Sequence, residues 1–344
     1  GFIGSCLVSA LNEIGITKII LVDNFLEEKK NKNLKNKKYY KKIPRNIFIE
    51  WFKINNKDIS LVFHLGARTD TISSNYKVFE KLNLYYSQNL WQTCSINKIP
   101  FIYASSAATY GSGDLGFEDK HNNIKNLRPL NAYSKSKNEF DKWILRQDLA
   151  PPYWIGLKFF NVYGPNEYHK GPMSSVIFHM FNQIAVNAKV NLFKSHNRNY
   201  QHGEQLRDFI YVKDVINVLI FIKNNRINNG IYNLGTGKAR SFIELSNIIF
   251  DTLNVTPNII LIITDDQRWD AIGYAGNEII ITPEQDQLAK EGTYFKKAFV
   301  TTPICGASRA TIITGLYERK HKFTLGGTTL DSIYNQQNYA YELK

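Results

Sequence analysis

Short apolar segments alternate with longer amphipathic segments up to about residue 255 of this 344-residue chain. The segments that favour strands are 18–25, 61–67, 99–106 and 153–164, and those that favour helices are 4–14, 76–97, 131–148 and 173–187. Strands that alternate with helices form βαβ units with parallel strands. The pattern therefore predicts an α/β fold with a doubly wound parallel sheet, whose ligands bind at the carboxyl ends of the strands.

The pattern restarts near residue 256. A continuous apolar segment at 259–263 follows Pro257 and leads to Asp265 and Asp266. A continuous apolar run of this length is typical of a buried parallel strand, and here it ends in paired carboxylates. We therefore predict two domains, 1–255 and 256–344, of which the second begins a new α/β fold.

Charge and cysteine content limit the class of protein. The formal net charge is +13, but the excess is concentrated in residues 29–45, which contain no acidic residue. A solvated, compositionally biased loop explains this segment better than a nucleic-acid surface, with one or two lysines left to face a phosphate. The three cysteines, Cys6, Cys94 and Cys305, are too far apart for a disulfide framework or a zinc knuckle. No apolar run approaches the ~18 residues of a membrane helix. We expect a reduced, cytoplasmic protein with no nucleic-acid or membrane partner.

Two glycines open the chain at a spacing that suits nucleotide binding. Gly1 and Gly4 begin an apolar-periodic segment, as do the last two glycines of a dinucleotide fingerprint, where a helix N-terminus approaches a pyrophosphate. Asp23 ends the next predicted strand, where a carboxylate can accept a hydrogen bond from a ribose hydroxyl. The strand and first glycine of the fingerprint are expected just upstream of Gly1.

A tyrosine and a lysine provide candidate acid–base groups. Tyr133 and Lys137 lie four residues apart on one helical face. The Lys137 ammonium could lower the pKa of the Tyr133 phenol and hold a ribose, while Ser106 could hydrogen-bond the same substrate oxygen. A phenol with a lowered pKa can work with hydride transfer to a nicotinamide. A lone pair of this kind is usually structural, but Ser106 and the fingerprint favour catalysis.

Seven segments of the first domain resemble the extended short-chain dehydrogenase/reductase family. They are GFIGS, VFHLGA, YASSAATYG, PLNAYSKSK, FFNVYGPNEYHKGPMSSVIFH, LRDFIYVKDV and GIYNLGTGKARSF. The resemblance covers residues 1–253 and implies a Rossmann-like fold, a nicotinamide cofactor and a possible homo-oligomer. It implies epimerase chemistry on an ADP-heptose-type sugar nucleotide of lipopolysaccharide synthesis. Asp23 alone favours NAD, whereas the resemblance implies NADP with lysines after the second strand at its 2′-phosphate.

The resemblance also implies the residues of the site. The cofactor would contact Gly1, Phe2, Ile3, Gly4, Asp23, Asn24, Leu65, Gly66, Ala67, Arg68, Thr69, Asn83 and Lys137. The sugar nucleotide would contact Asn161, Val162, His179, Phe193, Lys194, Ser195, His196 and Arg207. Hydride would leave C6 to give a transient ketone and return on the other face, with Tyr133 serving one epimer and Lys170 the other. Without the resemblance, Lys170 is more simply an exposed loop lysine.

The chain departs from the family pattern in three places. Pro172 stands where the family has a serine, which puts one substrate hydrogen bond in doubt. The family also has a strand before the position of Gly1 and a further substrate-domain segment after about residue 253. We therefore expect an epimerase domain truncated at both ends, with weak cofactor affinity and marginal stability.

The second domain resembles the N-terminal part of the sulfatase family, whose fold is alkaline-phosphatase-like. The matching segments are PNIILIITDDQRWDAIGY and TTPICGASRATIITGLY. The resemblance implies calcium bound by Asp265, Asp266 and Cys305, with Cys305 oxidised to formylglycine and its hydrate held by Arg309. Ala307 replaces the usual proline, as in an accepted variant. The alternative is that Cys305 is a small buried hydrophobe.

Three functions remain open. The first is a sugar-nucleotide epimerase, which has the more complete set of residues, and the segment around Lys170 separates it from related dehydratases and reductases. The second is a sulfatase, because its specific but incomplete motif lies in the second domain. The third is an inactive chimeric fragment that binds nucleotide weakly at best.

Overall fold

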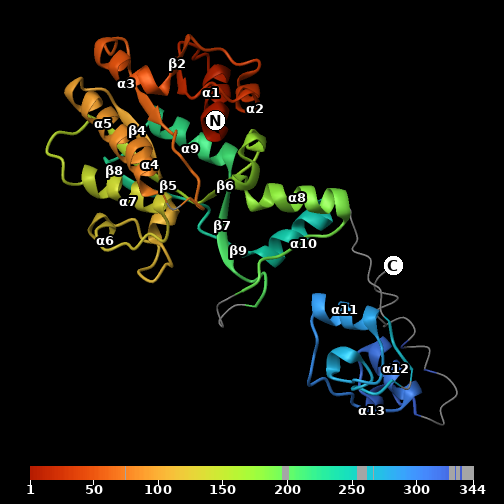
Figure 1. Cartoon of the computed structure of the whole chain (residues 1–344). Coiled ribbons are helices and arrows are strands. Elements are labelled where there is room, and N and C mark those ends of the chain that lie inside the picture. Colours follow the sequence, from red (N-terminus) through yellow and green to blue (C-terminus); the bar gives the residue numbers. More distant parts are fainter. Residues whose placement is uncertain are drawn as a thin grey trace. The chain divides into compact units, whose positions relative to one another are not determined.

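The computed structural model describes residues 1–73, 75–195, 201–253, 262–265, 267–324, 330 and 334. The chain divides into two compact units, 1–257 and 258–344 (Figure 1). Within the described residues, no helix is both long and apolar enough to cross a membrane.

The first unit alternates helices and strands along the chain. In order, its elements are α1 (Phe2–Glu13), β1 (Ile20–Asp23), α2 (Glu28–Asn31), η1 (Lys32–Leu34), β2 (Lys41–Pro44), α3 (Arg45–Ile54), β3 (Val62–His64), α4 (Tyr76–Phe79), η2 (Glu80–Tyr85), α5 (Tyr86–Ile96), β4 (Phe101–Ser106), η3 (Ala107–Tyr110), α6 (His121–Ile124), α7 (Ala132–Ile144), β5 (Trp154–Phe159), β6 (Asn161–Tyr163), η4 (Tyr168–Met173), α8 (Val176–Asn187), β7 (Leu206–Tyr211), α9 (Val212–Asn224), β8 (Gly230–Leu234), β9 (Ala239–Ser241) and α10 (Phe242–Thr252).

Parallel strands dominate the sheets of this unit. β3, β4, β5 and β8 form a four-stranded parallel sheet in that order, and β1 pairs with β2 in a second parallel sheet. A third sheet has the order β6–β7–β9, in which β7 and β9 run antiparallel. The predicted α/β class with a parallel sheet is confirmed.

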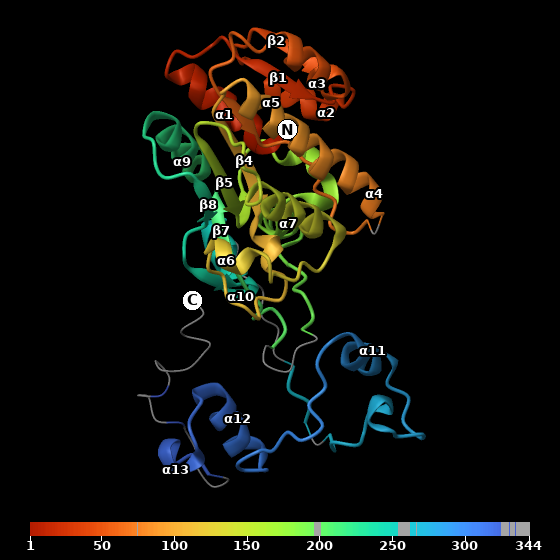
Figure 2. The same ribbon diagram turned by 90° about the vertical axis from the view of Figure 1, so that its left-hand side faces the viewer.

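Strand β4 shows how both faces of the four-stranded sheet are covered. Ile102 and Ala104 pack into one hydrophobic cluster with α1 and α9, whereas Phe101 and Tyr103 pack into another with α3, α5 and α7. Successive side chains of a strand point to opposite faces, so helices lie on both sides, as a doubly wound sheet requires. Figure 2 shows β4, β5 and β8 between α9 on one side and α7 on the other.

Two predicted elements differ from the observed ones. The segment 76–97 is divided into α4, a π-helical stretch at η2 and α5. The segment 153–164 contains two strands in different sheets, β5 and β6. The backbone leaves the first sheet after Phe160, whose N–H still donates to Leu234 O of β8 at 3.1 Å. The other predicted strands, at 18–25, 61–67 and 99–106, contain β1, β3 and β4, and the other predicted helices, at 4–14, 131–148 and 173–187, overlap α1, α7 and α8.

The described residues of the second unit form helices only. These are η5 (Gly273–Ala275), α11 (Pro283–Glu291), α12 (Cys305–Thr314) and α13 (Glu318–His321). The strand predicted at 259–263 lies outside the described residues except for Ile262 and Ile263, which belong to no strand. Ala307 and Ala310 are the buried hydrophobic residues among those described here, so this part has no extensive apolar core.

Candidate active site

Helix α7 and strand β4 position the predicted acid–base groups. Asn131 and Ser134 form a capping box at the start of α7, because Ser134 N donates to Asn131 Oδ1 at 2.8 Å and Asn131 N donates to Ser134 Oγ at 3.2 Å. The cap fixes the first turn, which carries Tyr133. Ser106 is the last residue of β4, and its hydroxyl caps η3 by accepting from Ala108 N at 3.2 Å.

The structure brings the Tyr133 phenol to the Ser106 side chain, to which it is hydrogen-bonded. Burial raises the pKa of Tyr133 above its usual range, the Ser106 hydrogen bond opposes this, and the negative charge of Asp141 adds to the increase. The predicted lowering of this pKa by Lys137 is therefore wrong, because burial outweighs the other influences. Tyr133 is a phenol at neutral pH and is ready to donate a proton.

Lys137 lies one turn further along α7 and is 4% exposed. Its ammonium donates to Ala104 O on β4 at 2.8 Å. Burial lowers the pKa of Lys137 to about 8, against the opposing attraction of Asp141. Lys137 is therefore mostly protonated at neutral pH, yet close to the range in which it loses its charge.

The predicted nucleotide turn, at Gly1 before α1, lies in space beside Asp23, the last residue of β1. Helix α1 begins at Phe2 with Gly1 as its N-cap and without a side-chain cap, so its first amides can face an anion. Asp23 Oδ2 lies 3.1 Å from the Gly1 nitrogen, and Asp23 Oδ1 lies 2.6 Å from Lys30 Nζ. Burial opposes ionisation of Asp23, but the Gly1 ammonium and Lys30 outweigh it and lower its pKa.

The segment Leu65–Thr69 follows β3 and is held by Asn83. Asn83 Oδ1 accepts from Arg68 N at 2.8 Å, and Asn83 Nδ2 donates to Arg68 O and to Ser136 Oγ, both at 3.0 Å. Asn83 is 1% exposed, and its amide is already paired. Asn83 therefore acts by tying this segment to α7. Asn24, another predicted cofactor residue, donates its backbone N–H to Asp23 Oδ1 at 2.7 Å.

Lys170 lies in η4, and its ammonium is 5.5 Å from the centre of the Phe2 ring. Burial lowers the pKa of Lys170, and Glu167 opposes this shift. Glu167 fixes the loop by accepting from Gly164 N at 3.0 Å and from Ser175 Oγ at 2.9 Å. Lys170 is thus half-buried against the nucleotide turn rather than an exposed loop lysine. In the described part of the chain, no direct contact joins it to Tyr133.

The predicted substrate residues come from the third sheet and its neighbours. Asn161 and Val162 lie on β6, Arg207 lies on β7, His179 lies on α8, and Phe193, Lys194 and Ser195 follow α8. Helices α8 and α10 pack beside each other next to this sheet (Figure 1). Asn161 Nδ2 donates to Asp208 O at 2.9 Å, and the Phe193 ring lies 5.1 Å from that of Phe242. His196 lies outside the described residues.

In the second unit, Cys305 is the exposed first residue of α12, and Arg309 follows one turn later. Arg309 Nη2 lies 3.1 Å from Asp265 Oδ2, and Asp266 lies outside the described residues. The described part contains no group of three or more His, Cys, Asp or Glu side chains that could hold a metal. The described donors alone do not fit a calcium ion, which takes six to eight oxygens.

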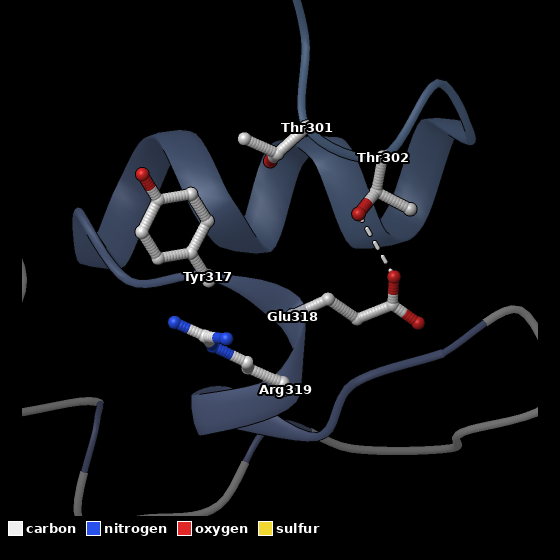
Figure 3. Close-up of a pocket in the computed structure, with 5 residues that line it drawn as sticks. All are labelled: Thr301, Thr302, Tyr317, Glu318 and Arg319. Atoms are coloured by element: carbon white, nitrogen blue, oxygen red, sulfur yellow. Dashed lines mark hydrogen bonds between the residues drawn. The ribbon is translucent and has the colours of Figure 1, made fainter.

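A surface hollow of the second unit lies elsewhere in its sequence. Figure 3 shows its lining residues, Thr301, Thr302, Tyr317, Glu318 and Arg319. Thr302 Oγ1 donates to Glu318 Oε2 at 2.8 Å, and the Arg319 guanidinium lies 5.5 Å from the centre of the Tyr317 ring. Neither Cys305 nor Arg309 lines this hollow, so it does not assemble the sulfatase-like residues.

Comparison with known proteins identifies the first unit. Residues 1–235 match the model of the NAD dependent epimerase/dehydratase family. The chain belongs to this family. An ADP-L-glycero-D-manno-heptose-6-epimerase of Fusobacterium nucleatum is 47% identical over 250 residues, which are 72% of this chain and 75% of that protein. A protein of the same name from Nitratidesulfovibrio vulgaris is 42% identical over 261 residues, 75% of this chain and 80% of its own.

Solved structures agree with this family. The crystal structure of Helicobacter pylori ADP-L-glycero-D-manno-heptose-6-epimerase superposes with a TM-score of 0.64 at 30% identity and covers 74% of this chain and 79% of its own. The Rossmann-like epimerase fold and a nicotinamide cofactor are therefore confirmed for the first unit. The bare amides of α1 and the carboxylate of Asp23 fit such a cofactor.

Residues 257–341 match the model of the sulfatase family, which confirms the predicted resemblance of the second unit. Calcium, formylglycine, homo-oligomerisation and a cytoplasmic location stay predictions. Sequence reasoning did not single out Lys30 among the lysines of residues 29–45, and it missed Asp141 and Lys158. Two signals could have found the latter pair: Asp141 is four residues beyond Lys137, and Lys158 interrupts an apolar strand.

Proposed function

We propose that the chain inverts the configuration at C6 of an ADP-heptose-type sugar nucleotide. The observation that carries this proposal is the meeting of the Tyr133 phenol with Ser106 at the end of β4, with the Lys137 ammonium one turn behind. The relatives named as ADP-L-glycero-D-manno-heptose-6-epimerases support the choice of sugar. Related dehydratases share the fold, but the half-buried Lys170 provides the second proton-transfer group that epimerisation needs.

The proposed mechanism uses one proton-transfer group for each face of the sugar. When bound, the nicotinamide cofactor supplies the hydride acceptor and donor at C6. In one direction the uncharged Lys170 amine takes the proton of the C6 hydroxyl as hydride leaves C6, and the sugar then presents the other face of its ketone. The Tyr133 phenol gives its proton to the ketone oxygen as hydride returns, while the Ser106 hydroxyl holds that oxygen; the reverse direction uses the same two groups with their roles exchanged. Lys137 holds the ribose and adds a positive charge beside the phenol.

NADP rather than NAD is the proposed cofactor. Lys30 Nζ lies 2.6 Å from Asp23 Oδ1, and its chain lies beside Gly1, whose added Cβ would be 3.6 Å from Lys30 Cε. A carboxylate alone favours the free ribose hydroxyls of NAD. An ammonium at the same position offers a partner to a 2′-phosphate, so Lys30 is the lysine to which we assign this contact.

The proposal is tested with ADP-heptose of one C6 configuration, the full chain and NADP+, whose oxidised nicotinamide can accept the C6 hydride, following the second epimer by NMR. Tyr133→Phe and Lys170→Ala should each slow conversion by about a hundredfold or more, because each removes one proton-transfer group. Both should still bind NADPH, and more tightly than NADH, as measured by nicotinamide fluorescence.

Tyr168→Phe is the matched control, because Tyr168 is an exposed residue of the same segment as Lys170. It should convert the sugar at the wild-type rate. Full activity of Lys170→Ala would contradict the assignment of two groups. No conversion by the wild-type chain with NADP+ bound would contradict the function itself.

For the second unit, we infer that sulfate ester hydrolysis does not take place. The sulfatase-like helix α12 presents Cys305, but its Arg309 is paired with Asp265, whereas the resemblance implies that Arg309 holds the hydrate and Asp265 binds calcium. The proposed calcium site of Asp265, Asp266 and Cys305 would supply too few oxygens to bind the ion tightly. Formylglycine at Cys305 would therefore lack the positive field that activates its hydrate.

A further inference from the structure

A fully buried ion pair lies behind the catalytic residues. Asp141 on α7 and Lys158 on β5 are both 0% exposed, with Lys158 Nζ 2.7 Å from Asp141 Oδ2. The free-energy cost of removing two charges from water often exceeds the gain from their attraction. A buried ion pair is therefore weak evidence for a stabilising role. Neither residue has a part in the proposed proton transfers, and the pair calls for another explanation.

Asp141 is bound to β4 from both of its oxygens. Tyr103 Oη donates to Asp141 Oδ1 at 2.9 Å, and Ser105 Oγ donates to Asp141 Oδ2 at 2.6 Å. Gly156 on the neighbouring strand makes room for this arrangement, because a Cβ at that position would lie 2.4 Å from Tyr103 Oη. The sequence of two adjacent strands is thus adapted to this one carboxylate.

The helix presents three functional groups to β4 in succession. Tyr133, Lys137 and Asp141 are spaced by four residues and therefore share one face of α7. Tyr133 bonds Ser106, and Lys137 bonds Ala104 O. The Asp141 bonds to the same strand therefore hold the third turn of the helix whose first two turns carry the reacting groups.

Lys158 extends the same network to Ser106. Its ammonium donates to Thr109 Oγ1 at 2.6 Å, and the Thr109 hydroxyl donates to Ser106 O at 2.8 Å. One buried pair is therefore attached both to the helix that carries Tyr133 and Lys137 and to the turn that carries Ser106.

We propose that Asp141, held by Lys158, is a positioning residue for the proposed epimerase reaction, anchoring α7 on β4 and placing a negative charge behind the Lys137 ammonium. The proposal rests on the proposed function for its effect on turnover. The anchoring follows from the hydrogen bonds, and the electrostatic effect follows from the order of groups along the helix face.

The charges around Lys137 give the sign of the electrostatic effect. Burial lowers the pKa of Lys137 to about 8, and Asp141 opposes this shift. His64 on β3 also interacts with Lys137, but burial lowers the pKa of His64 to about 3, so it is neutral near pH 7. Tyr76 of α4 interacts with Glu139 of α7 and with Glu80 of η2 instead. Loss of the Asp141 charge should therefore shift the pKa of Lys137 further down.

Apart from the Lys158 ammonium, which is paired with Asp141, the remaining described groups near this face of α7 are uncharged at neutral pH. Burial raises the pKa of Tyr103 on β4 and of Tyr110 on η3, so both stay phenols. His121 of α6 accepts from Ile231 N at 3.0 Å through its Nε2. Lys158 on β5 completes the set, and its ammonium is directed at Asp141 and Thr109.

The test compares Asp141→Asn with Lys158→Met in the full chain. Both break the buried pair, but only the first removes the negative charge, since Asp141 keeps its bonds from Tyr103 and Ser105 in the second. The Lys137 resonance is followed by NMR of lysine-labelled protein and assigned by its absence in Lys137→Met. Asp141→Asn should move its titration down by about one pH unit or more, and Lys158→Met by much less.

If the pair had a purely structural role, the two variants would shift the Lys137 titration equally or not at all. Either result would overturn the electrostatic part of the proposal. Asp141→Glu should restore the wild-type titration. The same shift should appear in the pH profile of kcat. The Lys137 titration can be measured without turnover. If the expected shift appears in a chain that does not convert the sugar, the proposed function is contradicted and this inference is not.

Milder variants test the anchoring if Asp141→Asn does not fold. Tyr103→Phe removes one donor to Asp141, and Thr109→Val removes the link between Lys158 and Ser106. Each should lower kcat by about tenfold with little change in KM, because the reacting groups are displaced while the binding surface remains. Wild-type kcat in both variants would overturn the anchoring.

Discussion

At the scale of single residues, burial of the charged Lys137 lowers the free energy of unfolding, and its proposed catalytic role explains why the residue is kept there. Its pKa falls from the usual 10.5 to about 8, so the folded protein disfavours the charged form. Below pH 8 the full penalty applies, and it is relieved as the pH rises from 8 to 10.5, where only the unfolded chain is protonated. The penalty is about 3 kcal/mol.

We therefore expect Lys137→Met to raise the free energy of unfolding at pH 7 while abolishing epimerisation. The gain should be at most about 3 kcal/mol, reduced by the lost bond to Ala104 O, and should shrink toward pH 10. Urea denaturation at several pH values measures it. Lys135→Met, on the exposed side of the same helix, is the control and should show no such pH dependence. A Lys137→Met chain less stable than wild type at pH 7 would contradict the penalty.

Residue spacing allowed part of the site to be predicted from the sequence. Tyr133 and Lys137 share a helical face by their spacing, and Ser106 and Asp23 end their strands by the apolar pattern. The direction of the Tyr133 pKa could not be predicted, because it depends on burial by segments distant in the sequence. The choice of Lys30 among many lysines depends on the path of the chain after β1, which composition does not specify.

At the scale of elements, the apolar pattern located strands better than it delimited them. Residues 153–164 are apolar apart from Lys158 and Asn161, and two isolated polar residues do not show at which of them the chain leaves one sheet for another. The π-helical stretch η2 likewise follows from packing against α7 rather than from a helix-breaking residue. Strand pairing and helix register depend on partners elsewhere in the chain, which local periodicity does not contain.

Helix α12 gives a prediction of its own. We expect no turnover of an aryl sulfate by the full chain, even with Cys305 converted to formylglycine and calcium added. Asp265 is paired with Arg309, and the described donors are too few for a calcium ion. Mass spectrometry checks the conversion of Cys305, and a chromogenic sulfate measures hydrolysis. Turnover that is lost in Asp265→Asn would contradict this expectation and support a second catalytic unit.

At the scale of the whole molecule, the two units differ in their apolar cores. The three hydrophobic clusters of the described residues all belong to the first unit. In the second unit, large side chains such as Trp269 and Ile279 are 79% and 91% exposed. Local stability follows buried apolar contacts, so the units should differ in how easily their amides become accessible.

We expect hydrogen exchange to show strong protection of β4 and β5 and weak protection throughout α11 and α12. Mass spectrometry of peptides from the full chain measures both in the same sample. Addition of NADPH should slow exchange in the first unit and leave α11 and α12 unchanged. Protection of α12 equal to that of β4 would contradict the expected difference.

Among the described residues, β1 and β3 are edge strands of two different sheets of the first unit. β1 is bonded to β2 and β3 is bonded to β4, while Ile19 beside β1 and Phe63 in β3 pack on the same cluster. An unpaired strand offers its N–H and C=O groups as a template for any extended chain. We therefore expect that an extended chain, including a strand of a second copy, can add to these edges through backbone hydrogen bonds. Self-association of this kind would not depend on surface side chains, and surface charge alone would not prevent it.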